Sequence, residues 1–193
     1  MDALEAILTR RSTRRFSEEA VDKALIEKVI EAGRYAPSGS NSQSTHFIVF
    51  TDPAQLEEIA GIVQDAFAAM ELEEDMYISM KASISAAKKG GYVFHYKTPV
   101  LIVTANKKGY GNAMADSACA LENMMIAANA LDLGSCWINQ LHWLEEKDAV
   151  HSFLMRHGLQ EDETVTGALA LGHPAQALTR RMAPRKGNPV TWA

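Results

Sequence analysis

The stretch AMADSACALENMMIAANALDLG, residues 113–134, is the longest helix candidate in the chain and decides the fold class. Its side chains are apolar around most of the circumference of a helix, and Gly134 is expected to end it. A helix of this kind must be covered on most sides. The stretch therefore predicts either a central core helix or a helix that is shared with a second subunit.

Short apolar runs on both sides of this stretch predict the strands of a small sheet. The clearest is TPVLIVTA, residues 98–105, which is continuous and rich in β-branched residues, as buried strands are. Further strands are expected at 45–50, 135–138 and 164–172. Amphipathic or capped segments predict helices at 2–8, 21–36, 51–63, 65–90 and 144–158. The predicted class is α+β, with a small sheet wrapped by helices in a single domain over residues 1–193.

The composition excludes several classes of partner. The chain has 193 residues and a formal net charge of -5, whereas a protein dedicated to DNA or RNA usually has a basic surplus. No apolar run reaches the ~18 residues of a membrane span, and the acidic start MDALEAILTRR is unlike a signal peptide. Cys119 and Cys136 show neither metal spacing nor a disulfide framework, and both are expected to be packed. A cytoplasmic protein without nucleic-acid or membrane partners is predicted.

Motifs for metal binding or side-chain catalysis are missing from the sequence. The six histidines are scattered, with no HExxH pattern, so no metal site is expected. Ser12 and Ser38 lack the GxSxG surroundings of a hydrolase nucleophile. Asp116 and Glu122 have no paired acid or base in the sequence, and we interpret them as helix-surface or interface carboxylates.

Three polar clusters could bind a ligand. Arg10, Arg11, Ser12 and Arg14 follow the first helix and offer guanidinium and hydroxyl donors suited to a phosphate. The loop APSGSNSQ, residues 36–43, combines small residues that allow close backbone approach with side-chain amides.

The third cluster, PRKGN at residues 184–188, is cationic and lies near the C-terminus. Taken singly, each of the three clusters is also explained by an ordinary role. Arginine clusters are usually solvated surface, Ser/Gly/Asn loops are usually turns, and basic tails usually extend into solvent.

Together and in this order, the motifs resemble the nitroreductase-type FMN-dependent oxidoreductases. The resemblance begins with ILTRRSTRRFS (7–17) and AGRYAPSGSNSQSTHFIVF (32–50). It continues through TPVLIVTA (98–105), DSACALENMMIAANALDLGSCWI (116–138), ALALGHPA (168–175) and PRKGNPV (184–190). It implies a small, mostly antiparallel sheet wrapped by helices, with the long central helix at a homodimer interface and FMN bound there.

The resemblance also implies which residues bind the cofactor. Contacts to the FMN phosphate and ribityl chain are expected from Arg10, Arg11, Ser12, Arg185 and Lys186, and a cation at the flavin N1–C2=O edge from Arg14. The loop that lies against the flavin of the other subunit is expected to use Pro37, Ser38, Gly39, Asn41 and Gln43. The segment with a backbone N–H facing flavin N5 is expected at Ile138, Asn139 and Gln140.

The function implied by the resemblance is transfer of hydride or electrons from NADH or NADPH through flavin N5 to a small organic acceptor. The acceptor could be a nitroaromatic, a quinone, an enone or a flavin, and a ping-pong cycle is expected. No side chain is assigned as catalytic, because the flavin carries the chemistry. The alternatives are a specialised flavin reaction such as reductive dehalogenation or flavin fragmentation, with a lid at 65–96, and a non-enzymatic FMN-storage module.

The chain departs from the family pattern near the expected cofactor and substrate pocket. Ser44, Thr45 and His46 stand where relatives commonly have tryptophan, and GHP (172–174) replaces the more usual tyrosine form. Asn139 and Gln140 occupy positions where many relatives carry glycines. These departures leave the acceptor open.

Overall fold

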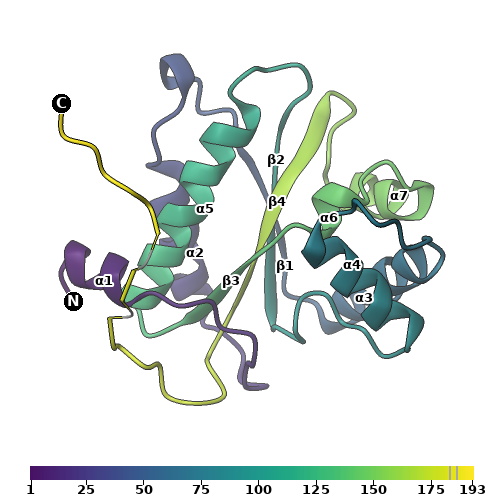
Figure 1. Ribbon diagram of the computed structural model, residues 1–193, viewed down its shortest axis with the longest axis horizontal. Coiled ribbons are helices and arrows are strands. Elements are labelled where there is room, and N and C mark those ends of the chain that lie inside the picture. Colours follow the sequence, from purple (N-terminus) through teal and green to yellow (C-terminus); the bar gives the residue numbers. More distant parts are fainter. Residues whose placement is uncertain (183, 186) are drawn as a thin grey trace.

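The centre of the molecule is a four-stranded antiparallel sheet (Figure 1). The computed structural model describes residues 1–182, 184–185 and 187–193. The strand order is β1-β2-β4-β3, with bounds β1 His46–Phe50, β2 Val100–Lys107, β4 Glu163–Gly172 and β3 Gly134–Ile138. The four expected strands and the α+β class with a mostly antiparallel sheet are confirmed.

The sheet is buried on both faces, which explains why its central strands are apolar without interruption. In β2, Leu101 and Val103 belong to the core on one side, and Val100 and Ile102 belong to the core on the other. All four side chains are at most 1% exposed. Successive side chains of a strand point to opposite faces, so a strand between two helical layers needs apolar residues at every position.

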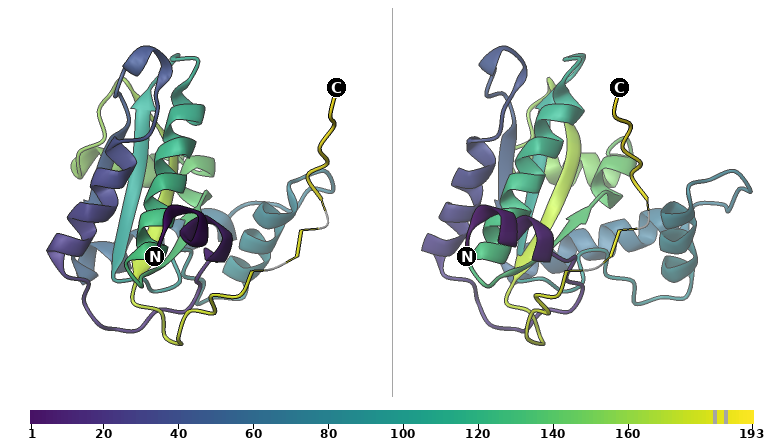
Figure 2. Two further views of the ribbon diagram at one scale, coloured as in Figure 1. Left: turned by 90° about the vertical axis from the view of Figure 1, so that its left-hand side faces the viewer. Right: turned by 60° about the vertical axis from the view of Figure 1, so that its left-hand side comes forward.

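One helical layer consists of α1 (Ala3–Thr9), α2 (Lys23–Arg34) and α5 (Ala113–Ala130). Figure 2 shows α5 against the sheet with α2 beside it, and α1 crossing near one end of α5. Its core contains Val29 of α2 with Leu121 and Met124 of α5. Leu121 and Met124 are three residues apart on α5, so their side chains lie on the same face of the helix, the one that packs against the sheet.

The other layer consists of α3 (Pro53–Ala68), α4 (Ile78–Lys88), α6 (Gln140–Trp143) and α7 (Asp148–Arg156). The expectation of helix throughout 65–90 is wrong, because residues 69–77 leave the helical conformation between α3 and α4. That interval contains four carboxylates within residues 71–75, and like charges at helical spacing disfavour a helix. Helix α6 was not expected, since four residues are too few to show a helical period.

The ends of the helices follow the sequence signals in part. Asp2 and Asp52 cap α1 and α3 as expected, each accepting a backbone N–H at 2.9 Å. Gly134, however, does not end α5. The helix stops at Ala130, and Asp132 adopts the positive φ of 62° that turns the chain into β3.

The outer face of α5 is not covered by the rest of this chain. Met114 is 46% exposed and Cys119 is also exposed, so the expectation that Cys119 is packed is wrong for the single chain. Cys136 in β3 is 2% exposed, as expected for a packed side chain. No helix among the described residues is long and apolar enough to cross a membrane.

Candidate functional site

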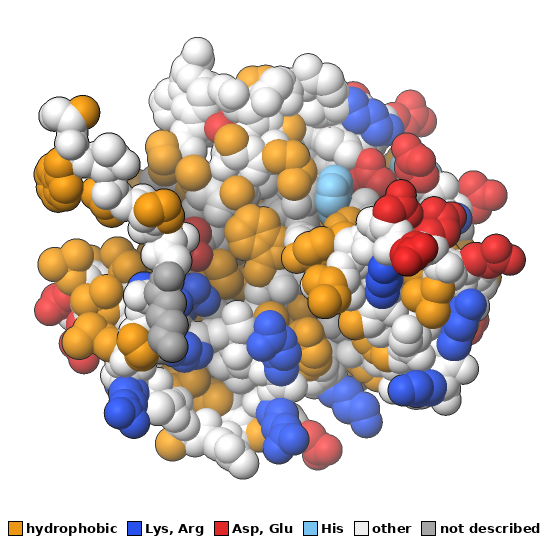
Figure 3. Space-filling view, in the orientation of Figure 1, with side chains coloured by type: hydrophobic (Ala, Val, Ile, Leu, Met, Phe, Trp, Pro, Cys, Tyr) orange, Lys and Arg blue, Asp and Glu red, His pale blue; other side chains and the backbone are white. Residues whose placement is uncertain are grey.

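The arginine segment, residues 10–16, lies between β3 and the chain that follows β4. The backbone N–H of Thr13 donates to the carbonyl of Ser135 at 2.8 Å, and the N–H of Ala175 donates to the carbonyl of Arg15 at 3.0 Å. Backbone hydrogen bonds on both sides therefore fix the course of this segment. Figure 3 shows Lys and Arg side chains gathered over the lower part of the face on which this segment runs.

Gly134 permits this close approach of the arginine segment to β3. A Cβ atom at Gly134 would lie 2.7 Å from Cγ2 and 2.8 Å from Oγ1 of Thr13, which is closer than real Cβ atoms come to their neighbours. The glycine is therefore required by packing at the start of β3.

Arg10 and Ser12 present donors that suit an anionic ligand. The Nε atom of Arg10 lies 3.4 Å from Oε1 of Glu122 in α5, yet Nε is buried and makes no hydrogen bond among the described residues. Ser12 is exposed beside it. A charged, buried N–H without a hydrogen-bond acceptor is unusual in a folded protein, and a phosphate oxygen would satisfy it.

Arg11 is directed elsewhere. Its guanidinium donates to the carbonyl oxygens of Leu8 at 3.2 Å and Arg10 at 2.6 Å, and also to the carbonyl of Arg181. These bonds join the arginine segment to the C-terminal part of the chain. Arg11 is thus held by the backbone, unlike Arg10.

Of the two expected C-terminal cations, Arg185 and Lys186, the structure describes only Arg185. Arg185 is exposed on the extended segment that leaves the body of the molecule in Figure 1. Lys186 lies outside the described residues. Arg180, five residues before Arg185 in the sequence, forms an ion pair with Asp132, which lies just after the end of α5.

Arg14 is exposed and lies near the aromatic ring of Tyr96. The central carbon of its guanidinium is 6.0 Å from the ring centroid. Hydrogen bonding with the Tyr96 side chain raises the pKa of Arg14 further above its ordinary value, so the group stays a cation. Tyr96 itself adopts a positive φ of 58°, which is uncommon for an aromatic residue and marks this position as constrained.

Cys136 forms part of the wall behind these side chains. Burial raises the pKa of its thiol, although the nearby charge of Arg14 and a hydrogen bond with Ser12 act in the opposite direction. A buried neutral thiol is a poor nucleophile. The interpretation of Cys136 as a packed side chain therefore holds in the structure.

Ile138 ends β3, Asn139 follows it and Gln140 begins α6, so this stretch lies at the end of the strand to which the arginine segment is hydrogen-bonded. From Ser135 to Ile138 the strand advances by about 10 Å. The indole N–H of Trp137 donates to Oδ1 of Asn139 at 2.6 Å, and the backbone N–H of Asn139 donates to Oε1 of Gln140 at 3.2 Å. The structure thus places two of the expected groups along β3, with residues 10–14 beside its start and residues 138–140 at its end.

The loop of residues 36–43 is held by the first turn of α5. The backbone N–H of Gly39 donates to Oδ1 and Oδ2 of Asp116, at 3.1 and 3.2 Å, and the Tyr110 hydroxyl lies 2.9 Å from Oδ2. Asp116 is only 7% exposed, so of the two interpretations of this residue, a helix-surface or an interface carboxylate, the first is wrong. Its charge is satisfied by donors from the loop.

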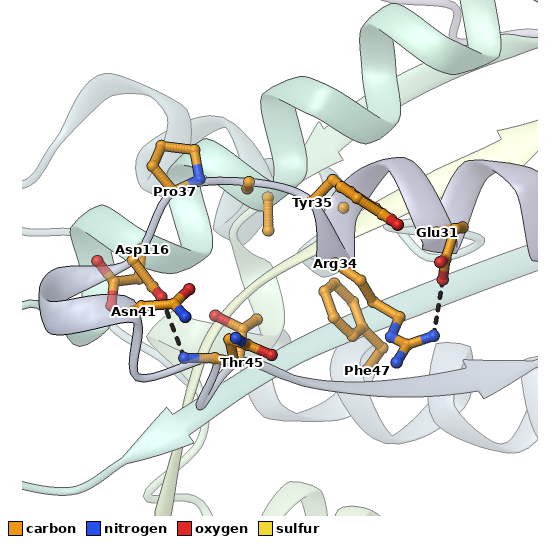
Figure 4. Close-up of a pocket in the computed structure, with 13 residues that line it drawn as sticks. Glu31, Arg34, Tyr35, Pro37, Asn41, Thr45, Phe47 and Asp116 are labelled. Carbon is orange, nitrogen blue, oxygen red and sulfur yellow. Dashed lines mark hydrogen bonds and ion pairs between the residues drawn. The ribbon is translucent and has the colours of Figure 1, made fainter.

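The loop has a strained backbone and borders a cavity. Ser40, Asn41 and Gln43 adopt positive φ values of 50–54°, an uncommon conformation for residues other than glycine. The cavity of about 510 Å³ is lined by the loop, the end of α2, β1 and α5 (Figure 4). In Figure 4, Pro37 and Asn41 of the loop and Phe47 of β1 surround it.

The loop and helix α1, which directly precedes the arginine segment, are held at opposite ends of α5 within one chain. Asp116, in the first turn, holds the loop, whereas Asn129, in the last turn, donates to the carbonyl of Ala6 at 2.9 Å and to Oγ1 of Thr9 at 3.0 Å. From Asp116 to Asn129 the helix rises by about 20 Å. Figure 2 shows the same separation, with the loop at the top and α1 lower in both views. The cavity beside the loop is lined by none of residues 10–14 or 138–140, so a single chain does not bring all the expected site residues together.

Several residues of the site were not singled out from the sequence. Tyr110 orders the loop together with Asp116, for which the sequence indicates another role, while Tyr92 and Tyr96 contact the parts expected to face the flavin. Only Asp116 carried a usable signal, because an acidic side chain within an otherwise apolar helix needs a specific partner. No group of His, Cys, Asp and Glu that could hold a metal ion occurs among the described residues.

Comparison with known proteins gives the relationship of the chain. The family model described as the nitroreductase family matches residues 7–173. A protein of Archaeoglobus fulgidus described as an NADH dehydrogenase/NAD(P)H nitroreductase is 29% identical over 177 residues, which cover 90% of this chain and 86% of that protein.

Solved structures extend the likeness to the whole fold. A nitroreductase with bound FMN from Bacteroides fragilis has a TM-score of 0.88 and 31% identity, covering 100% of both chains. A nitroreductase with bound FMN from Desulfitobacterium hafniense has a TM-score of 0.84, covers 100% of this chain and 99% of that one, and at 23% identity shows the shared fold. Since the family match spans most of the sequence, this chain belongs to the nitroreductase family.

Proposed function

We propose that this chain is an NAD(P)H-dependent FMN oxidoreductase that reduces a small organic acceptor. The observation that carries the proposal is that the arginine segment hydrogen-bonds to β3 through Thr13 and Ser135, while residues 138–140 lie at the end of the same strand. The 31% identity to a nitroreductase structure with bound FMN, over the full length of both chains, supports FMN as the ligand.

The residues fit a phosphorylated flavin. Arg10 supplies a buried N–H that makes no hydrogen bond among the described residues, and Ser12 supplies an exposed hydroxyl beside it. These two groups would hold the phosphate end, with Arg11, Arg185 and Lys186 as further cations toward that end. Arg14 would hold the pyrimidine edge, where its fixed positive charge favours the negative charge of a reduced ring.

When bound, FMN supplies the redox chemistry, accepting hydride at N5 from NADH or NADPH and then passing reducing equivalents to the acceptor in a ping-pong cycle. The protein residues orient the ring and set its electrostatic surroundings. No acid or base pair is required of the protein, consistent with the buried, neutral Cys136 and with Asp116 being engaged by the loop.

The proposed enzyme is a homodimer with FMN at the subunit interface. The loop, including Pro37, Ser38, Gly39, Asn41 and Gln43, would then lie against the flavin held by the arginine segment of the second copy. Two facts support this arrangement. In one chain the loop is held by the first turn of α5, whereas α1, just before the arginine segment, is held by its last turn, about 20 Å away. The outer face of α5 is exposed with Met114 and Cys119, and Leu4 and Ile7 of α1 are further exposed apolar residues.

The segment between α3 and α4 is the part of the chain best placed to select the acceptor. Tyr77, at its end, packs edge-on against Trp143 of α6 with ring centroids 5.9 Å apart. Leu72 of this segment and Ile78, the first residue of α4, are exposed apolar residues. A nitroaromatic, quinone, enone or flavin could contact such a surface, and a specialised reaction would place its specificity here too. We propose a cytoplasmic, single-domain enzyme for this chemistry.

The purified protein tests the proposal directly. It should be yellow or become so with added FMN, and NADH or NADPH should bleach the flavin bands without oxygen. A colourless protein that does not take up FMN contradicts the proposal. Bound FMN that neither donor reduces would instead identify the storage module. Sedimentation should show a dimer, and a folded monomer that retains FMN would contradict the shared site.

A further inference from the structure

The side chain of Gln140 connects residues 138–140 to the helical hairpin α3–α4. Its Oε1 atom accepts the backbone N–H of Asn139 at 3.2 Å, and its Nε2 atom lies 3.1 Å from the Tyr92 hydroxyl and 3.4 Å from Oγ of Ser83. Tyr92 follows α4, and Ser83 lies within it. Figure 1 shows α4 and α6 next to each other in this layer.

The proton positions in this network follow from its chemistry. The Asn139 N–H can only donate, so Gln140 must turn its Oε1 toward Asn139 and its NH₂ toward Tyr92. The Tyr92 oxygen then accepts from Gln140, and its proton is free to donate to Ser83 Oγ at 2.9 Å. Ser83 in turn donates to the carbonyl of Ser79 at 3.1 Å. The hydrogen bonds thus all run in one direction, from Gln140 through Tyr92 and Ser83 to the carbonyl of Ser79.

The position of Tyr92 is fixed by its contacts with α3. Its backbone N–H donates to Oε1 of Gln64 in α3 at 2.7 Å, and its ring packs edge-on against Phe67 of the same helix. Ser83 is 4% exposed. Burial raises the pKa of the Tyr92 hydroxyl, despite the opposing hydrogen bonds with Ser83 and Gln140, so the hydroxyl keeps its proton.

We propose that Tyr92 is a positioning residue, which acts through Gln140 to fix the backbone amide of Asn139. The proposal rests on the function proposed above, in which residues 138–140 face the flavin. The alternative is that Gln140 is an ordinary side chain whose removal leaves this backbone unchanged. The link depends on the side chain of Gln140, and a glycine at position 140 could not form it.

Loss of the Tyr92 hydroxyl would release the amide in a measurable way. With phenylalanine at position 92, the Gln140 NH₂ group keeps only the longer contact to Ser83, and its amide can rotate away from Asn139. The Asn139 N–H would then spend more time bonded to water. The ring of position 92 would still pack against Phe67, so the fold should be retained.

The test compares amide hydrogen exchange in Tyr92→Phe and Tyr77→Phe, measured by NMR without added FMN. Tyr77 is a matched control, because it also joins this hairpin to α6 but does so by ring packing against Trp143. Exchange at Asn139 should accelerate by about two- to tenfold in Tyr92→Phe, the effect of one hydrogen bond, and stay unchanged in Tyr77→Phe. Unchanged exchange in Tyr92→Phe overturns the proposal.

A second variant protects the test against a folding defect. Gln140→Ala removes the side chain that links Asn139 to Tyr92, at a half-buried position. Amide exchange at Asn139 should accelerate by a similar factor in this variant. If Tyr92→Phe does not fold, this variant decides the question, and unchanged exchange at Asn139 overturns the proposal.

The FMN-loaded protein tests the effect on the cofactor. In Tyr92→Phe the rate of flavin reduction by NADH or NADPH should fall by about two- to tenfold, while the FMN dissociation constant stays within about twofold. Faster exchange with an unchanged reduction rate overturns the positioning role. Failure to bind FMN in the wild type would refute the proposed function, and the exchange result would then stand only for the link between Tyr92 and Asn139.

Discussion

Asp116 and Gly39, which are 77 residues apart in the chain, are joined by one backbone N–H that both oxygens of the Asp116 carboxylate accept. The Tyr110 hydroxyl contacts the same carboxylate at 2.9 Å and the Gly39 carbonyl at 3.2 Å. This arrangement fixes a loop of strained backbone to a helix terminus. Negative charge is favourable at that position, because the N-terminal end of a helix carries a partial positive charge.

Substitution of Gly39 by alanine should loosen this loop. The new Cβ would lie 2.6 Å from the Tyr110 hydroxyl and 2.2 Å from Nδ2 of Asn112. Tyr110 cannot move away without weakening its contact to Asp116, so we expect a loss of ~1–3 kcal/mol in the free energy of unfolding. Urea denaturation measures this change.

Gly61→Ala is the matched control for that experiment. Gly61 lies within α3, is exposed, and has nothing within 4 Å of the position of a Cβ. Alanine favours a helix by ~0.5–1 kcal/mol over glycine, so this variant should be more stable than the wild type. Equal effects of the two substitutions would show that packing at Gly39 is not responsible.

Replacing Arg10 by alanine should weaken FMN binding by ~1.5–3 kcal/mol, since a charge-assisted contact to phosphate is lost. Fluorescence titration with FMN measures the loss. Riboflavin lacks the phosphate and should bind the variant and the wild type alike. Arg15→Ala, at an exposed position on the same segment, should leave both affinities unchanged. Equal losses for FMN and riboflavin would assign Arg10 a structural role through Glu122.

Arg14→Gln should lower the midpoint potential of the bound flavin. Glutamine keeps much of the length and hydrogen bonding of arginine but removes the charge that favours the reduced, anionic ring. A differential stabilisation of about 1.4 kcal/mol corresponds to a decrease of ~30 mV for a two-electron couple. Redox titration measures it, with slower reduction by the nicotinamide donor as a consequence. An unchanged potential with FMN fully bound would place Arg14 away from the ring.

The buried histidine His95 should make stability depend on pH. It is 4% exposed, its Nε2 lies 3.2 Å from the Leu56 carbonyl, and burial lowers its pKa from the ordinary value of 6.5. Below pH 6.5 the unfolded chain takes up a proton that the folded chain resists, so this contribution to stability is present above pH 6.5 and lost as the pH falls toward the folded pKa. In His95→Gln the decline in unfolding free energy from pH 7 to pH 5 should be smaller. Parallel curves for both proteins would contradict the assignment.

The strands and the cluster of arginines could be recognised in the sequence because their signals are local. The stretch Val100–Lys107 is apolar almost without interruption, which indicates a strand buried on both faces. The cluster from Arg10 to Arg14 is recognised by its high density of positive charge. The helix caps at Asp2 and Asp52 are equally local, since each side chain bonds to a backbone N–H within three residues.

The rest depends on contacts between distant parts of the chain. Nothing near Asp116 in the sequence indicates that Gly39 is its partner, and nothing near Tyr92 indicates Gln140. The turn after α5 was misplaced for a different reason. A positive φ is most often adopted by glycine, but here Asp132 adopts it. Gly134 is needed instead within β3, where a larger residue would collide with Thr13.

The position of the loop at one end of α5 and of α1 at the other has a consequence for how this sequence can change. One inserted residue between Asp116 and Asn129 would lengthen the helix by about 1.5 Å and rotate one attachment by about 100° relative to the other. The loop and the segment that follows α1, which are the two halves of the proposed FMN site, would then lose their register at once. We therefore expect relatives to keep the length of α5 constant, whereas the exposed segment 69–77 can gain or lose residues without disturbing either half.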